Sequence, residues 1–524
     1  MKVKAKKLNK GQPVRVRMAP SPTGPFHIGS ARTAFFNYLF ARKNHGQFIV
    51  RIEDTDKERS KPEWEENIKE SLAFLGLDYD EGPDKEGPFG PYRQSQRTVI
   101  YRKYLENLLA SGHAYYCFCS AQDLEAYKQE RISRGKPAIY SGQCRGVSDK
   151  EAQERIRAGQ SCVIRLKTPA KQVVFDDLLI GKIKYNSADF GDTVIAKDIE
   201  TPLYNLACVI DDFEMQITDV IRGEEHISNT PRQVLIAQAL GIEPPSYLHL
   251  PLILNQQRAK LSKRDTNIAA KVSDYKENGY LQEALINFLA FLGWNPGDDR
   301  EIFSKEELIN EFSIERLQKA GAVFNVQKLD WLNGYYIRKM SIRDLTNKCI
   351  PFLIKADLVT PLWGRSQAVP LVYDSDFTIL EYESNSSKER FSFGQISNIV
   401  ALYQERLKRL GEIPELVDSF FVKDLDYPKE LLKWRQSEWQ EMPAILGQLI
   451  QLLQALKPED WTEERLEQAI MPQAEQTGDR GKLLWPLRVA LSGKQASAGP
   501  FEIAAVLGPE KTILRLKQAQ TKLL

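Results

Sequence analysis

The sequence predicts an α/β nucleotide-binding domain that is interrupted by an α+β insertion and followed by a helical C-terminal domain. Three observations indicate this. A strand-like run at residues 14–18 leads through a Gly/Pro turn into a helix-like run at residues 31–42, which is how nucleotide-binding α/β domains begin. The same alternation of strand and helix returns after residue 205. Beyond residue 341, apolar residues recur mainly at helical spacing.

The first half of the nucleotide-binding domain extends to about residue 102. Residues 47–52 predict a second strand, and residues 60–75 predict a helix. Carboxylates follow the second strand, beginning at Glu53. Ligands of open parallel sheets sit at the carboxyl ends of the strands, so we expect Glu53 to lie near a bound ligand.

Short strand patterns separated by polar helices interrupt this domain over residues 103–205, which indicates an inserted α+β domain. The nucleotide-binding pattern resumes over residues 206–245. Residues 246–340 contain a basic loop and then helices. Residues 341–524 are expected to be helical, except for a polar segment near residues 364–395 that we expect to be a loop.

Composition restricts the class of protein. The 524 residues are 42% hydrophobic and 27% charged, as in soluble globular proteins of more than one domain. The net charge of +2 does not indicate nucleic-acid binding, so any basic surface must be local. Six cysteines are too few for a disulfide scaffold. No signal peptide and no run of about 18 apolar residues is evident, so we expect a cytoplasmic protein without a membrane span.

The turn before residues 31–42 carries features that suit a phosphate ligand. Gly24 and Gly29 remove side chains where a ligand could approach the backbone, and His27 would lie beside the first turn of the helix. A helix N-terminus offers N–H groups and a positive dipole end to phosphate. Alone, the stretch could equally be a Pro-rich turn before an ordinary helix. The basic loop Lys260-Leu-Ser-Lys-Arg264 favours the phosphate interpretation.

The two stretches His27-Ile-Gly-Ser30 and Lys260-Leu-Ser-Lys-Arg264 together resemble the paired "HIGH" and "KMSKS" signatures of class I aminoacyl-tRNA synthetases. Their context resembles the glutamyl-tRNA synthetases in particular. That context is Arg17-Met-Ala-Pro-Ser-Pro-Thr-Gly24, Arg51-Ile-Glu-Asp-Thr-Asp56 and Val220-Ile-Arg-Gly-Glu-Glu225. The resemblance covers nearly the whole chain and is most specific in the first 340 residues.

The sequence departs from the general signatures at Ser30, Leu261 and Arg264, and all three residues are usual in the glutamate subgroup. Ser30 replaces a histidine, so one stabilising group must come from elsewhere.

The resemblance implies a Rossmann-type catalytic domain with an inserted α+β connective domain that holds the acceptor end of tRNA. Residues 246–340 would form a stem-contact domain with the Lys260 loop, and residues 341–524 an all-α anticodon-binding domain. The implied enzyme is a glutamate–tRNA ligase. It would activate L-glutamate with ATP to glutamyl-adenylate and transfer the glutamyl group to the 3′ end of tRNA-Glu.

In that reaction His27 and Lys263 would be catalytic, because they would stabilise the charge that develops on the phosphates. Magnesium would accompany ATP and would need no protein cage of its own. The residues implied to bind ATP are Gly24, His27, Gly29, Lys260, Ser262, Lys263 and Arg264.

Glutamate carries two carboxylates and one ammonium, so its pocket needs two cations and one anion. By resemblance the pocket residues are Arg17, Ser21, Glu53, Tyr204 and Arg222. Glu53 would bind the ammonium, and Arg17 and Arg222 would divide the carboxylates. From the residues alone, Arg17 could be a strand arginine that faces solvent, and Glu53 and Arg222 could belong to structural salt bridges. Cys208 occupies a position where some relatives place asparagine.

Three cysteines and a tyrosine suggest a structural zinc site, because zinc prefers four ligands and binds thiolates well. The four residues are Cys117, Cys119, Tyr140 and Cys144. The pattern resembles the zinc site in the connective domain of some glutamyl-tRNA synthetases, although others place a histidine where this chain has Gly146. The alternative is three reduced cysteines without a metal.

Two alternatives to strict glutamate charging stay open. The enzyme could charge tRNA-Gln as well as tRNA-Glu, or the chain could be a non-catalytic RNA-binding protein derived from a synthetase. The presence of His27, Lys263 and Arg17 favours an enzyme. We expect a monomer.

Overall fold

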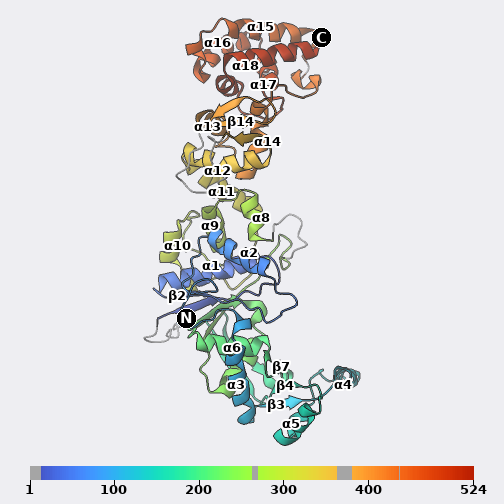
Figure 1. Cartoon of the computed structure of the whole chain (residues 1–524). Helices are drawn as coiled ribbons and strands as arrows, with labels where there is room; N and C mark the ends of the chain where they lie inside the picture. The colour runs from blue at the N-terminus through green and yellow to red at the C-terminus, as the bar shows by residue number, and fades with distance from the viewer. Residues whose placement is uncertain (1–12, 262–269, 363–380, 436, 524) are drawn as a thin grey trace. The chain divides into compact units, whose positions relative to one another are not determined.

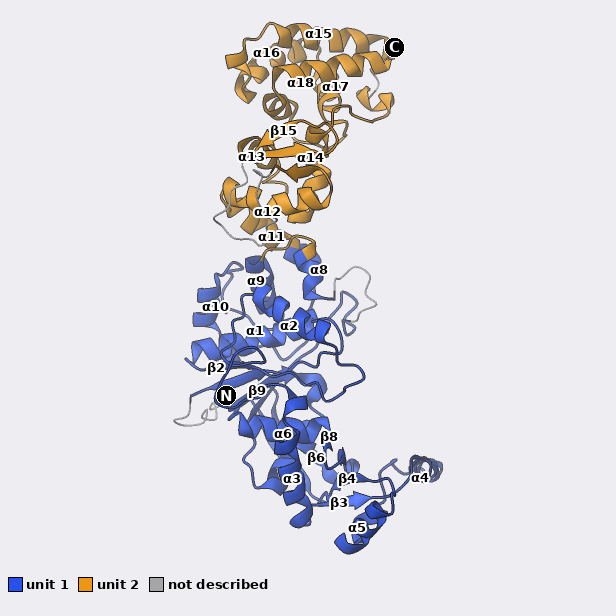
Figure 2. Cartoon of the chain, in the orientation of Figure 1, with its two compact units in different colours: residues 1–276, 282–329 blue, residues 277–281, 330–524 orange. Residues whose placement is uncertain are grey.

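A computed structural model of the chain describes residues 13–261, 270–362, 381–435 and 437–523 (Figure 1). It consists of two compact units, which Figure 2 distinguishes by colour. Unit 1 comprises Met1–Lys276 and Gln282–Leu329, and unit 2 comprises Glu277–Leu281 and Asp330–Leu524. Each unit has its own buried apolar core.

Two parallel strand pairs, each connected through a helix, form the centre of unit 1. They are β1 (Arg15–Met18), α1 (Ile28–Lys43) and β2 (Gln47–Val50), and then β9 (Asp219–Gly223), α7 (Thr230–Leu240) and β10 (Ser246–Leu250). The backbone N–H of Thr218 donates to the carbonyl oxygen of Arg15 at 2.9 Å, so the two pairs lie side by side. The expected nucleotide-binding α/β fold is therefore confirmed.

α1 is buried on nearly all of its surface because it packs on β1, β2 and β9 and is covered by later helices of unit 1. The sequence places Phe35, Tyr38 and Leu39 on one side of this helix. In the structure Phe36 and Phe40, on other sides, are buried as well. The burial fixes α1 and with it the turn that precedes it.

The insertion has its own antiparallel sheet, in the order β3-β4-β7-β8. Its elements are β3 (Ala114–Cys117), α4 (Ala121–Ser133), α5 (Asp149–Arg157), β4 (Val163–Leu166), β7 (Val194–Asp198) and β8 (Thr201–Pro202). It shares one apolar core with the nucleotide-binding domain. Buried residues of that core include Tyr101, Ile164, Ile195 and Val220.

One hairpin of the insertion extends the nucleotide-binding sheet instead. β5 (Gln172–Asp177) pairs with β6 (Gly181–Asn186) and also with β10, which gives the order β6-β5-β10-β9. The sequence analysis predicted short strands in the insertion, but it could not say which sheet they join. Asp177, at the end of β5, consequently lies next to Tyr247 of β10.

The other elements of unit 1 surround this sheet (Figure 1). They are α2 (Pro62–Phe74), α3 (Thr98–Ala110), α6 (Tyr204–Glu214), β11 (Ile253–Leu254), α8 (Val272–Glu277), α9 (Gln282–Phe291), α10 (Lys305–Glu311) and β12 (Ala322–Val323). Short 3-10 helices include Gln94–Gln96, Gln143–Gly146, Ser187–Asp189, Glu224–His226 and Ile314–Arg316. Among the helices that the structure describes, none is both long and apolar enough to cross a membrane.

Unit 2 is mainly helical, as expected. Its helices are α12 (Ile342–Lys355), α13 (Phe393–Ala401), α14 (Ile413–Phe421), α15 (Met442–Gln454), α16 (Glu463–Gln476), α17 (Gly481–Ser492) and α18 (Pro500–Leu523). Its short 3-10 helices include Leu410–Glu412, Lys429–Leu432, Trp439–Glu441 and Pro458–Asp460. α11 (Val326–Lys339) begins in unit 1 and continues into unit 2.

Unit 2 also contains a small antiparallel sheet that the sequence analysis did not expect. Its strands are β13 (Val359–Pro361), β14 (Glu381–Ser384) and β15 (Arg390–Ser392). The expected loop near residues 364–395 is thus wrong for residues 381–395, which form two strands and the start of α13. Tyr382 and Phe391 are buried partners across the strands, and the ring of Phe391 packs on that of Phe421 at 5.0 Å. In the sequence, Tyr382 and Phe391 are two apolar residues in a polar segment, which is too weak a pattern to predict strands.

Candidate active site

The turn that begins α1 is held by the segment that follows the basic loop. The N–H of Ile28 donates to the carbonyl oxygen of Ala270 at 3.0 Å, and the N–H of Val272 donates to that of Phe26 at 3.0 Å. His27 and Lys271 therefore form an antiparallel bridge. The start of this helix is thus paired with the segment that follows the basic loop, more than 200 positions away in sequence.

The basic loop is described up to Leu261. The N–H of Leu261 donates to the carbonyl oxygen of Ile253 at 2.9 Å, and Lys260 is exposed. Ser262, Lys263 and Arg264 lie outside the described residues, so the structure gives no position for three of the expected ATP-binding residues, including one of the two expected catalytic residues.

A cavity of about 900 Å³ opens beside the start of α1. All five residues expected to bind glutamate line it, namely Arg17, Ser21, Glu53, Tyr204 and Arg222. Gly29 also lines the cavity, and a Cβ built on Gly29 would meet no atom within 4 Å. Gly24 and His27 belong to the same turn but are not among the lining residues.

Arg17 does not face solvent, because a buried carboxylate holds it. Its side chain is 4% exposed, and its Nε donates to Asp212 Oδ1 at 3.1 Å. Arg51 donates to the same oxygen at 2.7 Å and to Glu53 Oε1 at 3.1 Å. Burial would raise the pKa of Asp212, but Arg17 and Arg51 outweigh this effect and lower it to about 2. Asp212 therefore stays ionised and orients Arg17 at the cavity.

Asp211, the neighbour of Asp212 in α6, binds a different set of side chains. Its carboxylate accepts from Arg97 Nε at 2.7 Å, from Gln94 at 2.8 Å and from the hydroxyl of Tyr101 at 2.8 Å. It lies 3.7 Å from Arg51 Nε. Consecutive carboxylates of α6 thus connect Arg17 of β1, Arg51 directly after β2, and Tyr101 of α3 in a network of buried side chains.

Arg222 is a buried cation whose hydrogen-bond acceptors are all neutral. Its Nε donates to His249 Nε2 at 3.2 Å, and its Nη2 donates to Thr230 at 2.9 Å and to Gln233 at 2.8 Å. Its Nη1 is buried and has no hydrogen-bond partner within the part of the chain that the structure describes. A guanidinium in this state suits an anionic ligand in the cavity.

The buried charges of the site do not cancel. Among the buried residues that line the cavity, Arg17 and Arg222 provide two positive charges and Glu53 provides one negative charge. Burial raises the pKa of Glu53, and Arg51 and Arg17 oppose that shift. The site therefore complements a small ligand with one net negative charge that also carries a cation for Glu53.

His226 is a lining residue that the sequence analysis missed. Its Nδ1 lies 3.1 Å from the hydroxyl of Tyr204. Burial lowers the pKa of His226 to about 3, and Arg222 and Arg17 lower it further in the same direction. The imidazole is therefore neutral and adds no further cation to the pocket.

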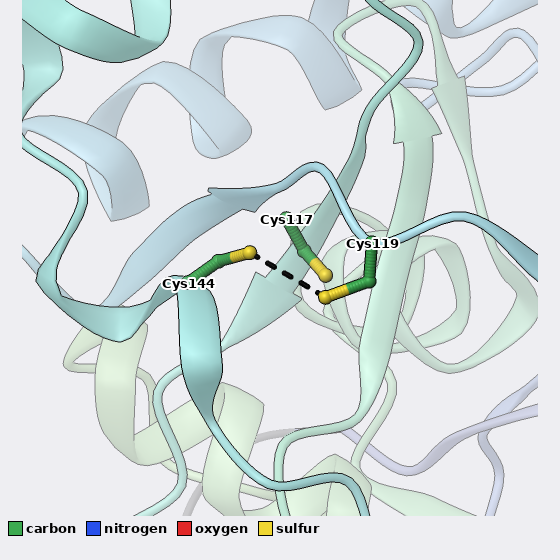
Figure 3. Close-up of side chains that lie close together, drawn as sticks. All are labelled: Cys117, Cys119 and Cys144. Atoms are coloured by element: carbon green, nitrogen blue, oxygen red, sulfur yellow. Dashed lines mark hydrogen bonds between the residues drawn. The ribbon is translucent and has the colours of Figure 1, made fainter. Parts of the chain in front are cut away.

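The three cysteines expected to bind zinc meet in the insertion (Figure 3). Cys117 ends β3, Cys119 follows it, and Cys144 lies on the short helix Gln143–Gly146; their sulfur atoms lie within 4.8 Å of one another and point together. The hydroxyl of Tyr140 lies 3.2 Å from the sulfur of Cys117 and 3.6 Å from that of Cys119. Zinc binds sulfur at about 2.3 Å, so tetrahedral sulfurs lie roughly 3.8 Å apart. The four side chains fit such an ion.

Comparison with known proteins decides the family. Residues 13–331 match the family model "tRNA synthetases class I (E and Q), catalytic domain". A glutamate–tRNA ligase of Geobacillus thermodenitrificans (strain NG80-2) is 43% identical over 510 residues, which cover 97% of this chain and 98% of that protein. The chain belongs to the glutamate–tRNA ligase family of class I tRNA synthetases. The resemblance inferred from the signature residues is confirmed.

Further relatives agree with this family. The glutamate–tRNA ligase of Bacillus subtilis (strain 168) is 40% identical over 510 residues, covering 97% of this synthetase and 99% of that one. A crystal structure of a glutamate tRNA ligase from Elizabethkingia meningosepticum, in complex with its amino acid, has a TM-score of 0.82 at 33% identity. It covers 98% of this chain and 100% of that chain. Residues 348–520 match an anticodon binding domain.

The sequence analysis missed several buried residues of this synthetase. Asp211 and Asp212 could have been noticed as two adjacent acids directly after the apolar run Leu206–Ile210 of α6. Nothing in the sequence connects Asp177 or His249 to the site, because their contacts depend on which strands pair. Cys208, which stands where some relatives place asparagine, belongs to the same buried network. Its sulfur lies 3.6 Å from Asp212 Oδ2.

Proposed function

We propose that this synthetase is a glutamate–tRNA ligase that works in two steps. The carboxylate of L-glutamate attacks the α-phosphorus of ATP and releases pyrophosphate, and the terminal ribose of tRNA-Glu then takes the glutamyl group from the adenylate. The names of the relatives support this activity. The observation that carries it is the cavity beside α1, in which buried charges of net +1 complement glutamate, whose net charge is −1.

The pocket suits each charged group of glutamate. Glu53 would accept the ammonium, and Arg17 and Arg222 would divide the two carboxylates. Asp212 pairs with Arg17, whereas Arg222 has only neutral partners, so the two arginines offer different anion sites. Glutamine would leave one arginine without a charge partner in a desolvated pocket, and such mismatches are strongly rejected.

ATP would bind at the start of α1. Gly29 leaves space over the backbone there, and the helix N-terminus favours phosphate. His27 and the loop residues from Lys260 to Arg264 would stabilise charge on the phosphates, and Mg²⁺ would accompany ATP and add positive charge there. The insertion would hold the acceptor end of tRNA, and unit 2 would read the anticodon. We propose that the enzyme acts as a monomer in the cytoplasm.

The test is aminoacylation of purified tRNA-Glu and tRNA-Gln, each with radiolabelled glutamate or glutamine. We expect glutamyl-tRNA-Glu to form in an ATP-dependent reaction. Charging of tRNA-Gln with glutamate would identify a non-discriminating enzyme. Charging with glutamine alone would contradict the proposal. RNA binding that gives no product under any of these conditions would favour the non-catalytic scaffold.

We also propose a structural zinc ion held by Cys117, Cys119, Tyr140 and Cys144. The converging sulfur atoms and the phenol support this site. Four protein ligands leave no open position, so the ion would stabilise the insertion and take no part in the reaction. Arg165 lies over the ring of Tyr140, with its guanidinium carbon 3.9 Å from the ring centre, and would favour the anionic forms of nearby ligands.

A further inference from the structure

Arg222 is joined to a buried carboxylate through one histidine. His249 Nδ1 lies 2.7 Å from Asp177 Oδ2, and Arg222 Nε donates to His249 Nε2 at 3.2 Å. The three residues lie on the neighbouring strands β5, β10 and β9, and His249 and Arg222 are register partners. All three are at least 95% buried, so solvent cannot replace these contacts.

The hydrogen bonds of Asp177 fix the tautomer of His249. Asp177 Oδ1 accepts from the backbone N–H groups of Leu179 and Ile180 at 2.9 and 2.8 Å, and Oδ2 accepts from that of His249 at 3.0 Å. Because three backbone N–H groups already donate to this carboxylate, we assign Asp177 as the acceptor and His249 Nδ1 as the donor in their contact. Its Nε2 is then a lone pair that can accept from Arg222.

His249 remains neutral in this arrangement. Burial lowers the pKa of His249, and the nearby Arg222 acts in the same direction, whereas Asp177 opposes the shift. A protonated His249 would direct an N–H at the guanidinium Nε–H. The neutral tautomer is therefore the form that can hold Arg222.

The described contacts of Arg222 do not use all of its N–H groups. Its Nη2 is used by Thr230 and Gln233, and its Nη1 has no partner within the described ranges although the residue lines the cavity. We propose that Asp177 and His249 are positioning residues, which fix the orientation of the Arg222 guanidinium so that it meets a carboxylate of the amino-acid substrate at the cavity. This inference rests on the proposed function.

His249 itself is not a catalytic residue. It is 1% exposed and is not among the residues that line the cavity, so it touches the substrate only through Arg222. We call the hydrogen-bonded chain Asp177–His249–Arg222 the relay. Its loss should weaken amino-acid binding and leave ATP binding intact, because a misoriented arginine loses its bidentate fit to a carboxylate.

The test is steady-state aminoacylation by the full-length chain, with KM for glutamate and for ATP measured separately. The Asp177→Asn side chain has only one acceptor oxygen for the four N–H groups that face it, three from the backbone and one from His249. Its NH₂ group must therefore face either backbone N–H groups or the Nδ1–H of His249. We expect KM for glutamate to rise at least tenfold and KM for ATP to change less than twofold. Asp176→Asn, on the exposed side of the same strand, is the matched control and should match wild type.

A second pair of variants separates positioning from folding. His249→Gln keeps an amide oxygen for Arg222 and should restore much of the glutamate affinity that His249→Leu loses. Two results would overturn the relay and indicate a structural role. One is an equal rise in KM for glutamate and KM for ATP; the other is an equal loss of thermal stability and activity in His249→Gln and His249→Leu. An unchanged KM for glutamate in Asp177→Asn would also overturn it. If wild type charges another amino acid, only the proposed function fails, and the same KM ratio tests the relay with that substrate.

Discussion

Asp212 is the single residue on which the pocket depends most. It is 6% exposed and accepts from both Arg17 and Arg51, so one carboxylate serves two buried guanidinium groups. Asp212→Asn keeps the shape of the side chain but removes its negative charge. Among the described residues, Glu53 is then the nearest carboxylate to the buried cations Arg17 and Arg51. Breaking a buried ion pair from one side typically costs about 3–5 kcal/mol.

We therefore expect Asp212→Asn to lower the free energy of unfolding by several kcal/mol, about 3 or more. We also expect a raised KM for glutamate, because Arg17 is no longer held. Denaturant titration and aminoacylation kinetics measure the two effects. Asp298→Asn, which breaks an exposed ion pair with Arg300, is the control and should change neither quantity. A stable Asp212→Asn protein with normal glutamate affinity would contradict this account of Arg17.

The neutral imidazole of His226 makes stability depend on pH. Its pKa is about 3 in the folded chain against 6.5 ordinarily, so the unfolded chain binds the proton first as the pH falls. The stability that neutral His226 contributes is complete above pH 6.5 and is lost as the pH falls toward 3. We expect His226→Gln to lose stability less steeply than wild type over this interval. Parallel slopes in denaturant titrations at pH 7, 5 and 4 would show that the histidine is not buried in its neutral form.

At the scale of single elements, a substitution at the start of α1 should affect stability and ligand binding differently. Gly29 has helical neighbours and open space around its missing side chain, so alanine fits without a clash. Alanine is also the better helix former, by up to about 1 kcal/mol. The added methyl group nevertheless enters the cavity where ATP would approach the backbone.

We expect Gly29→Ala to keep or raise the melting temperature while raising KM for ATP severalfold. Gly447→Ala, inside α15 with only ordinary contacts near its added methyl, is the matched control and should leave KM unchanged. Calorimetry and pyrophosphate-exchange kinetics provide the two measurements. An unaltered KM for ATP in Gly29→Ala would place the nucleotide elsewhere.

The cysteine cluster is a second element with a direct test. Cys144→Ser removes one sulfur of the converging set, whereas Cys162→Ser changes a cysteine outside the cluster and is the control. We expect about one zinc per chain in wild type and in Cys162→Ser, and much less in Cys144→Ser. Elemental analysis of protein purified without chelator measures this. Metal-free wild type after expression in zinc-replete medium would identify three reduced thiols.

At the scale of the molecule, two units with separate cores predict separable unfolding. Compounds that bind the active site contact unit 1 and should stabilise that unit by mass action, by about 2.7 kcal/mol at 100 times Kd. We expect calorimetry to resolve at least two transitions, of which a non-hydrolysable glutamyl-adenylate analogue raises one. A single transition that shifts as a whole would mean that the two units unfold cooperatively.

The sequence by itself determined the family, the class of fold and most of the pocket. Signatures such as His27-Ile-Gly-Ser30 depend on residue identity at fixed local spacing, and alternation of strand and helix is a local pattern. Short strands in the insertion were therefore predictable from the sequence, and the resemblance to glutamyl-tRNA synthetases supplied five of the residues that line the cavity. Arg17 was the instructive exception among them, since periodicity alone favoured a solvent-facing side chain.

Only the tertiary structure decided which charges meet. Asp212 of α6 reaches Arg17 of β1 across 195 positions, and Asp177 reaches His249 across 72 because β5 pairs with β10. Register and strand order are long-range choices that no local pattern encodes, and the partner of a buried charge follows from them. The sequence therefore named the side chains that line the pocket, whereas folding selected the buried partners that orient them.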